Sequence, residues 1–190
     1  MSERSGCRIV LIGMMGSGKS TVGSLLAEAT GWPRYDNDLL LQDLYGMTAA
    51  ELVAARGDEA KRDAEDAALR HGLAMSSPFI LDAAGGTIDS EQSRNALSDA
   101  TVIWLHASPA TLYQRAFGAA HRPFLDNGET WMIETEARRR PLYASVADID
   151  IDTEDREPAD VAREGLRRLA QFCPELSSRV DPLASAGELR

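Results

Sequence analysis

The sequence predicts an α/β fold of three layers, in which a central parallel sheet is flanked by helices on both faces. Short apolar segments alternate along the chain with longer segments of helical periodicity, and strands spaced by helices form parallel sheets that are covered on both sides. Polar motifs follow several of these strands, and ligands bind at that edge of a parallel sheet. A third observation is a glycine-rich pattern at residues 13–20, between the first strand and the first helix.

The first strand and the first helix enclose this pattern. Arg8–Ile12 is an apolar strand. After position 20, apolar residues recur at spacings of three and four, which places them on one face of a helix that ends at Gly31. We therefore expect a strand, a glycine loop and a helix in succession.

The rest of the chain repeats the alternation, with recognisable helix starts. Residues 48–51 read as a capping box, and Asp89 with Gln92 is expected to cap a later helix. Ser108 stands before a proline, which is typical of a helix N-terminus. We expect further strands at 34–35, 79–81, 101–105 and 149–151, and further helices at 39–45, 58–73, 129–143 (interrupted near Pro141) and about 162–169.

Length and composition favour one domain. The chain has 190 residues, of which 44% are hydrophobic, so it can bury a substantial core. We assign residues 1–173 to a single domain and expect residues 174–190 to be a mobile tail, because that segment is rich in Pro, Ser and Gly and has no periodicity.

Charge and hydropathy exclude several function classes. The net charge of −10 argues against a general nucleic-acid binder, which needs a basic face. The longest apolar run near the N-terminus is the first strand, which is too short to be a signal peptide or a membrane span. We expect a cytoplasmic protein, monomeric by default, that acts on a small molecule.

The residues of the glycine loop predict binding of a nucleoside triphosphate. The loop fits G-x-x-x-x-G-K-[ST] at every specified position, and its backbone N–H groups would turn toward phosphate oxygens. Lys19 would reach the β- and γ-phosphates, and the Ser20 hydroxyl would be a ligand of Mg²⁺. An ordinary glycine turn is the alternative, but the intact flanks make it improbable.

Acidic residues follow two of the predicted strands. Asp36 and Asp38 would point the same way in extended backbone, and could hold the metal shell and accept a proton from a hydroxyl nucleophile. A polar turn that caps the next helix explains them equally well. Asp82 ends an apolar strand, as in a Walker B motif, where the carboxylate orients Mg²⁺.

Two other segments are candidates for substrate contact. Gly85 and Gly86 allow backbone N–H groups to approach a small ligand closely. Arg122 lies in a turn-rich segment, which we interpret as a mobile lid at about 116–128 that brings a cation to the transferred phosphoryl group. A solubilising surface arginine is the plainer alternative.

Together these motifs resemble the shikimate kinase family, whose fold is that of the P-loop NTPases. The resemblance runs from residue 9 to about residue 156. It rests on the following segments in this order: GMMGSGKST from Gly13, D-x-D at Asp36, G-D-x-x-x-R-x-x-E from Gly57, Gly85-Gly86, Arg115 with the R-P-F-L of the lid, R-R-P-L-Y from Arg139, and Asp152-Thr153.

The resemblance implies a role for each matched acceptor-side residue. Asp38 would hold the acceptor hydroxyls and act as the base or orienting group. Arg62 and Arg139 would clamp the substrate carboxylate, for which the bidentate fork of arginine is well suited, and Glu65 would orient Arg62. The backbones of Gly85 and Gly86 would contact the substrate.

On the nucleotide side, the resemblance implies ATP as the phosphoryl donor and Mg²⁺ as cofactor. Asp36 would sit in the magnesium shell with Ser20, and Asp82 is a further candidate. Lys19, Asp38 and Arg122 would be the catalytic set. The implied nucleotide contacts are Gly13, Gly16, Ser17, Gly18, Lys19, Ser20, Thr21, Arg115 and Arg156.

The chain departs from the family pattern mainly on the acceptor side. Lys61 replaces an aromatic residue that packs against the shikimate ring, and Ala84 replaces the first of three glycines. Asp82 replaces a residue that is usually neutral. These changes are either tolerated drift or marks of a different acceptor, such as another hydroxylated cyclic or sugar carboxylic acid.

Two further alternatives stay open at this point. A catalytically weak nucleotide-binding module would also keep the glycine loop. A nucleoside-monophosphate kinase shares the fold, but the D-x-D and the two arginines suit a polyhydroxy carboxylate better than a base.

Overall fold

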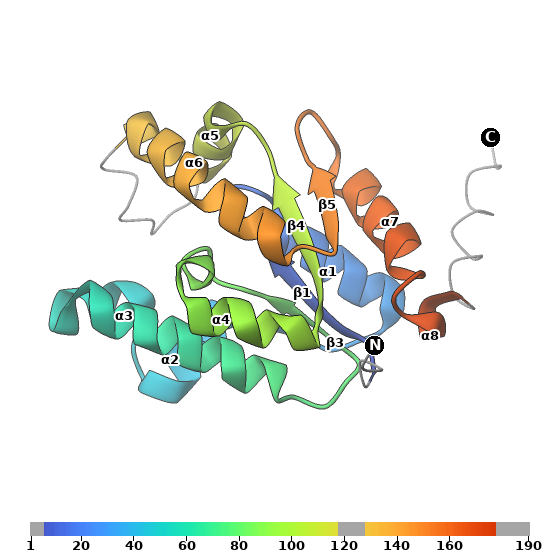
Figure 1. Cartoon of the computed structure of the whole chain (residues 1–190), viewed down its shortest axis with the longest axis horizontal. Coiled ribbons are helices and arrows are strands. Elements are labelled where there is room, and N and C mark those ends of the chain that lie inside the picture. The colour runs from blue at the N-terminus through green and yellow to red at the C-terminus, as the bar shows by residue number, and fades with distance from the viewer. Residues whose placement is uncertain (1–5, 118–127, 178–190) are drawn as a thin grey trace.

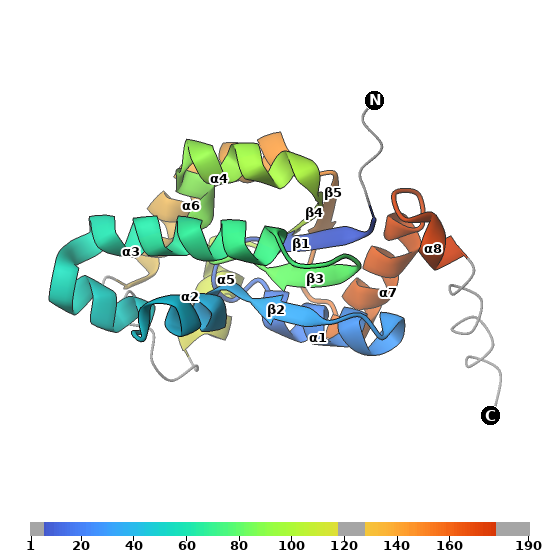
Figure 2. The same ribbon diagram turned by 90° about the horizontal axis from the view of Figure 1, so that it is seen from below.

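Five parallel strands form one sheet in the order β2-β3-β1-β4-β5. The computed structural model describes residues 6–117 and 128–177, and Figures 1 and 2 show it in two views. The strands are β1 (Arg8–Ile12), β2 (Arg34–Asp36), β3 (Phe79–Asp82), β4 (Thr101–His106) and β5 (Ile149–Asp152). The central strand β1 pairs with β3 on one side and β4 on the other, so the loop after β1 lies where the strand order reverses.

The helices cover both faces of the sheet, as the sequence predicts. They are α1 (Lys19–Thr30), α2 (Asn37–Tyr45), α3 (Ala49–Leu73), α4 (Glu91–Ala96), α5 (Pro109–Phe117), α6 (Gly128–Val146), α7 (Pro158–Leu169) and α8 (Pro174–Ser177), with short 3₁₀ turns η1 (Thr87–Asp89) and η2 (Leu97–Asp99). Figure 2 shows α4 and α6 on one side of the strands and α1 and α7 on the other. In the described part of the chain, every helix is too short or too polar to cross a lipid bilayer.

Side chains of β1 point alternately to the two faces of the sheet, and each face carries its own apolar cluster. Ile9 and Leu11 are fully buried in a cluster with apolar residues of α1 and α7. Val10 and Ile12 point the opposite way, into a second cluster that contains residues of α2, α3 and α6. Successive side chains of a strand face opposite sides of the sheet, so this uniformly apolar strand requires a helix layer on each side.

Several local signals in the sequence form as expected. The C-cap Gly31 has φ 69°, and its N–H donates to the Ala27 carbonyl. Thr48 and Glu51 form a reciprocal capping box at the start of α3. The Ser108 hydroxyl accepts from the Thr111 N–H at the start of α5.

Four sequence expectations need correction. The helix predicted at 58–73 is the second half of α3, which runs from Ala49 and is kinked at Gly57, where φ is 83° and ψ is 176°. The cap of α4 is Ser90, whose hydroxyl accepts from the Ser93 N–H, because Asp89 turns instead toward two arginines of α6. The helix expected to break near Pro141 continues to Val146.

The fourth correction concerns the tail. Residues 174–177 form the short helix α8, and Leu176 is 1% exposed in the cluster beneath α1 and α7. Leu176 packs this turn against the domain, so the packed part of the chain extends beyond position 173. Residues 178–190 of the predicted tail, and residues 118–127 of the predicted lid with Arg122, lie outside the described residues.

Candidate active site

The loop between β1 and α1 has the backbone of a phosphate cradle. Gly16 and Gly18 have φ values of 80° and 93°, which other residues adopt only with strain. A Cβ on Gly16 would also collide with the Leu112 carbonyl. Gly18 is the N-cap of α1 and has no side chain to cap it, so the first N–H groups of the helix are left for an anion.

Lys19 lies across this loop. Its ammonium group donates to the Gly13 carbonyl at 2.8 Å and to the Met14 carbonyl at 3.1 Å. The Ser17 hydroxyl oxygen is buried without a hydrogen-bond partner in the loop. A buried polar atom is costly to leave unpaired, and a phosphate oxygen would satisfy this one.

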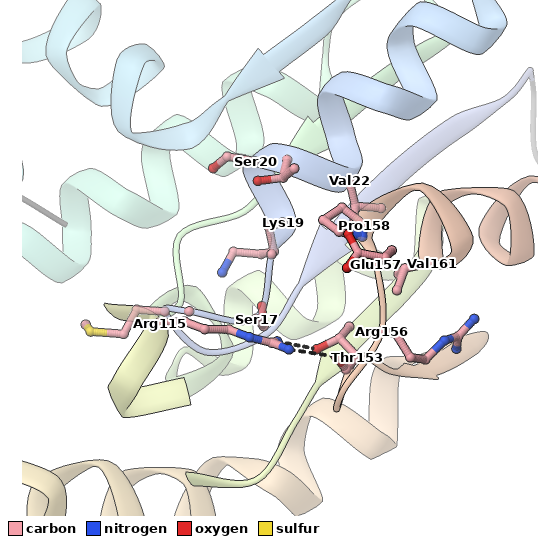
Figure 3. Close-up of a pocket in the computed structure, with 14 residues that line it drawn as sticks. Ser17, Lys19, Ser20, Val22, Arg115, Thr153, Arg156, Glu157, Pro158 and Val161 are labelled. Atoms are coloured by element: carbon pink, nitrogen blue, oxygen red, sulfur yellow. Dashed lines mark hydrogen bonds between the residues drawn. The ribbon is translucent and has the colours of Figure 1, made fainter. Parts of the chain in front are cut away.

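A pocket of about 370 Å³ opens beside the loop. Figure 3 shows Arg115 and Arg156 at its wall, as the resemblance implies. Arg115 of α5 donates to the Thr153 hydroxyl at 3.0 Å and to the Thr153 carbonyl at 2.8 Å. Arg156 is held by Glu164 at 2.8 Å. The full lining is Met15, Gly16, Ser17, Gly18, Lys19, Ser20, Thr21, Val22, Arg115, Thr153, Arg156, Glu157, Pro158 and Val161.

The two aspartates after β2 do not share an extended segment. Asp36 ends the strand and is the N-cap of α2, and its Oδ1 accepts the Asp38 N–H at 2.9 Å. Asp38 is in the first turn of the helix and is exposed. The expectation that both side chains point the same way from extended backbone is therefore wrong, because the helix begins between them.

Asp82 forms an ion pair with Arg34, which the sequence analysis did not predict. Arg34 Nε donates to Asp82 Oδ2 at 3.0 Å, and its Nη2 contacts both Asp82 and Asp36, the latter at 3.4 Å. Arg34 and Asp82 lie on neighbouring parallel strands, and the alternation of β2 puts the side chains of Arg34 and Asp36 on the same face. The pairing of β2 with β3 would have predicted the Arg34–Asp82 ion pair, but the sequence alone does not give the strand order.

This pairing limits what Asp82 can do for a metal. The side chain is 4% exposed, and burial raises the pKa of Asp82 to about 6, although the hydrogen bonds and charge of Arg34 oppose that effect. Among the described residues, no three His, Cys, Asp or Glu side chains gather in a way that could hold a metal ion. Mg²⁺ keeps several waters and needs few protein ligands, so exposed Ser20 and the half-buried Asp36 fit that ion better than Asp82 does.

The loop after β3 connects the phosphate loop to the acceptor-side residues. A Cβ on Gly85 would lie 3.4 Å from the Gly13 carbonyl oxygen and 3.9 Å from Arg139 Nη1. A Cβ on Gly86 would lie 2.6 Å from Glu65 Oε2. The buried Tyr143 hydroxyl donates to the Gly85 carbonyl at 2.9 Å and fixes the loop. The fold thus brings Gly85, Gly86, Glu65 and Arg139 together, as the resemblance implies.

Glu65 has a different partner from the one expected. It pairs with Lys61 at 3.1 Å, whereas Arg62 is exposed on α3. Positions 61 and 65 are four apart and lie on the same helix face, which allows this pair to form within α3. Burial raises the pKa of Glu65, Lys61 opposes this, and Glu65 Oε2 is buried without a hydrogen-bond partner.

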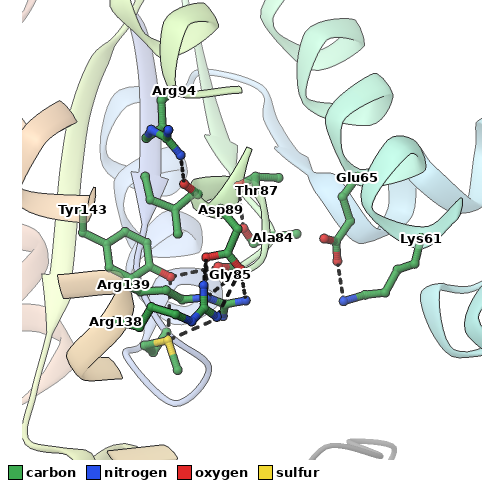
Figure 4. A network of polar contacts seen from close by, with 12 residues as sticks. Lys61, Glu65, Ala84, Gly85, Thr87, Asp89, Arg94, Arg138, Arg139 and Tyr143 are labelled. Carbon is green, nitrogen blue, oxygen red and sulfur yellow. Dashed lines mark hydrogen bonds and ion pairs between the residues drawn. The ribbon is translucent and has the colours of Figure 1, made fainter. Parts of the chain in front are cut away.

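Arg139 is held by a carboxylate that the sequence analysis assigned to a helix cap. Its Nη2 donates to Asp89 Oδ2 at 2.7 Å and its Nε to the same oxygen at 3.1 Å. Arg138 Nη1 binds Asp89 Oδ1 at 2.6 Å. Figure 4 shows this cluster beside Gly85, with the Lys61–Glu65 pair across from it.

Comparison with known proteins identifies the family. The family model of shikimate kinase matches residues 15–170. The chain belongs to the shikimate kinase family. It is 37% identical over 166 residues to a shikimate kinase of Rhodococcus jostii, covering 86% of this chain and 98% of that protein.

Solved structures agree with that membership. A shikimate kinase from Acinetobacter baumannii, solved in complex with shikimate, has a TM-score of 0.82 at 28% identity and covers 88% of this chain and 95% of its own. A gluconokinase from Sinorhizobium meliloti has a TM-score of 0.61 at 20% identity, covering 90% of this chain and 96% of its own, and shares the fold. Members of the shikimate kinase family are ATP-dependent phosphotransferases with an alcohol acceptor, and the predicted fold class and family are confirmed.

Proposed function

We propose that this chain transfers the γ-phosphoryl group of ATP to the 3-hydroxyl of shikimate. The observation that carries the proposal is the contact between the two loops: Gly85 lies against Gly13 of the phosphate loop on one side and near Arg139 on the other. A donor phosphate held by the first loop and a carboxylate held by Arg139 would therefore be close neighbours. Catalysis of this kind is mainly positioning and charge stabilisation.

On the donor side, the phosphate loop and the N-terminus of α1 would bind the phosphates, and Arg115 and Arg156 would flank the adenine. Lys19 would leave the Gly13 and Met14 carbonyls for the phosphate oxygens. Mg²⁺, when bound, would supply positive charge that offsets the negative charge of the phosphates, and Ser20 and Asp36 are the residues we assign to it. Arg122, from the lid, would add a positive charge at the transferred group.

On the acceptor side, Asp38 would orient the acceptor hydroxyl and accept its proton. Arg139 would bind the carboxylate, and the backbones of Gly85 and Gly86 would contact the ring. We keep Arg62 as the second carboxylate ligand, which requires its exposed side chain to turn toward the substrate. The chain would act as a monomer in the cytoplasm.

A second acceptor class is favoured by specific residues. Lys61 and Glu65 place a charged pair where the family has an aromatic side chain, and Ala84 adds a methyl group beside the glycines. A more polar hydroxylated acid would suit that lining.

The test is ADP release from MgATP with and without shikimate. Lys19→Ala serves as the blank, because the loop backbone would remain while the phosphate cation is lost. Shikimate-dependent ADP that is absent from the blank is expected. Release that shikimate does not stimulate, with ATP still bound, would contradict the proposal and direct the search to other hydroxylated acids.

A further inference from the structure

Asp89 lies between two consecutive arginines of α6 and has no part in the roles assigned above. Its Oδ1 accepts from Arg138 Nη1 at 2.6 Å, and its Oδ2 accepts from Arg139 Nη2 at 2.7 Å (Figure 4). The side chains of Asp89 and Arg139 are 20% and 13% exposed, whereas Arg138 is 57% exposed. Both arginines therefore converge on one half-buried carboxylate. It lies at the edge of the loop after β3 that contains Gly85 and Gly86, which we call the acceptor loop.

The hydrogen bonds leave one side of Arg139 available. A guanidinium group has five N–H donors in a rigid plane. Asp89 takes the side formed by Nε and Nη2. The remaining nitrogen, Nη1, lies 3.6 Å from the Met14 sulfur and 3.9 Å from the Cβ position of Gly85. A thioether is a weak acceptor, and the Tyr143 hydroxyl, which also interacts with Arg139, is neutral, so a carboxylate would be the stronger partner for Nη1.

The cluster formed by Asp89, Arg138 and Arg139 has a net positive charge that one bound anion would neutralise. Asp89 carries one negative charge against the two positive charges of Arg138 and Arg139, so the cluster keeps a net charge of +1. Burial alone would raise the pKa of Asp89, but the hydrogen bonds from Arg139 and Arg138 outweigh it and lower the pKa, so the group stays ionised. Across the loop, Lys61 pairs with Glu65, and the nearby Asp38 carboxylate adds to the burial that raises the pKa of Glu65.

The backbone that carries Asp89 is itself fixed. The Asp89 N–H donates to the Gly86 carbonyl at 3.0 Å, which couples it directly to the acceptor loop. The neighbouring Ser90 hydroxyl donates to Asp66 of α3 at 2.5 Å, and Ser93 donates to the same carboxylate at 2.5 Å. Asp89 can thus hold Arg139 in a defined place relative to the glycines.

We infer that Asp89 is a positioning residue for acceptor recognition, which holds Arg139 side-on so that Nη1 faces the substrate carboxylate. Arg138 compensates the charge of Asp89 and leaves the charge of Arg139 for the ligand. The inference rests on the proposed function, because it assigns the carboxylate of a hydroxylated acid to this cluster.

The test compares the steady-state constants of Asp89→Asn and Arg138→Gln with those of the wild type. Asp89→Asn increases the net positive charge of the cluster but loses the charge-assisted hydrogen bonds that place Arg139. Misplacement of Arg139 should dominate and raise the KM for shikimate about tenfold. Arg138→Gln should also raise it, because the cluster then has no net charge. In both variants kcat and the KM for ATP should change less than about twofold. Asp160→Asn, which removes an exposed Arg–Asp pair on α7, is the matched control.

A second acceptor separates positioning from a purely structural role. With the methyl ester of shikimate, which has no carboxylate charge, the wild type and Asp89→Asn should have the same KM. An unchanged or lower KM for shikimate in Asp89→Asn would overturn the inference, and so would equal losses with acid and ester. If the wild type converts no shikimate at all, the proposed function fails and the inference fails with it. Conversion by the wild type with unaltered variants refutes the inference alone.

Discussion

The buried Asp82–Arg34 pair leads to a prediction about stability and pH. Folding raises the pKa of the Asp82 carboxyl from its ordinary value of 3.8 to about 6, because burial disfavours the charged form more than Arg34 favours it. A tenfold change in proton affinity is about 1.4 kcal/mol, so the difference corresponds to about 3 kcal/mol. The folded state binds this proton more tightly, so its contribution to stability is complete below pH 3.8 and is lost as pH rises through 6.

Asp82→Asn removes this titration and is the perturbation to make. Measurements at pH 5.5 and pH 8 stay above the sequence pI of about 4.8. Over that interval the wild type should lose about 1 kcal/mol relative to Asp82→Asn, since much of the carboxyl is protonated at the lower pH in the folded state alone. Urea unfolding followed by the fluorescence of the buried Trp32 and Trp104 gives the free energies.

The exposed-site variant Asp160→Asn should show no comparable pH dependence relative to the wild type. A stability difference between the wild type and Asp82→Asn that is the same at both pH values would refute the reasoning. So would a difference of the opposite sign, which would mean that Arg34 dominates over burial and keeps Asp82 ionised.

Three other substitutions test the acceptor side. Asp38→Asn should lower kcat about 10²- to 10⁴-fold while ATP binding, measured by calorimetry, persists; retained turnover would remove Asp38 from the chemical step. Lys61→Met should lower the free energy of unfolding by about 3 kcal/mol, because Glu65 loses its only ion-pair partner in the described residues, and Lys61→Met/Glu65→Gln should recover most of it. An undiminished stability of Lys61→Met would show that the pair is not what keeps Glu65 in place. Gly86→Ala should cost about 2 kcal/mol, since its Cβ would lie 2.6 Å from Glu65 Oε2. The same substitution in a Glu65→Ala background, where that oxygen is absent, should cost less, and an equal loss in both backgrounds would contradict the steric cause.

The sequence was sufficient for the features that depend on local pattern. The strand at Arg8–Ile12, the Gly31 stop and the Thr48–Glu51 box depend on neighbours within one or two turns, and all three form. β5 also follows its pattern, with Ile149 and Ile151 buried and the aspartates between and after them exposed. Periodicity therefore predicted the three-layer architecture before any contact was known.

The wrong predictions for Asp89 and Asp82 share a physical cause: each carboxylate binds an arginine that is distant in sequence instead of the partner expected from its neighbours. Asp89 reads as a cap because it precedes a polar helix start, but Arg139 is 50 residues away and binds its carboxylate more strongly than a backbone N–H would. Asp82 reads as a metal ligand until Arg34, 48 residues earlier, is brought beside it by strand pairing. Pattern alone gives no strand order, so it could not reveal either pair.

The helix at 129–143 was predicted, but its uninterrupted course through Pro141 was not, for another reason. Proline removes one hydrogen bond from the helix, yet packing on the preceding and following turns can hold the helix together. Tyr143, two residues later, is 2% exposed and stacks on Trp104 with ring centroids 5.9 Å apart. Its hydroxyl also binds the Gly85 carbonyl, so the continuation of α6 serves the acceptor loop.

Phosphorus-31 NMR of the enzyme with MgATP and shikimate would show the transfer itself, because it follows the phosphorus atom that moves from ATP to the acceptor. We expect the γ-phosphate resonance to be replaced by that of a phosphate monoester, coupled to the proton on carbon 3 of the ring, and we expect Asp38→Asn to form it at least about 10²-fold more slowly. Inorganic phosphate as the sole new resonance would mean hydrolysis without an acceptor, and would contradict the claim that this site phosphorylates shikimate.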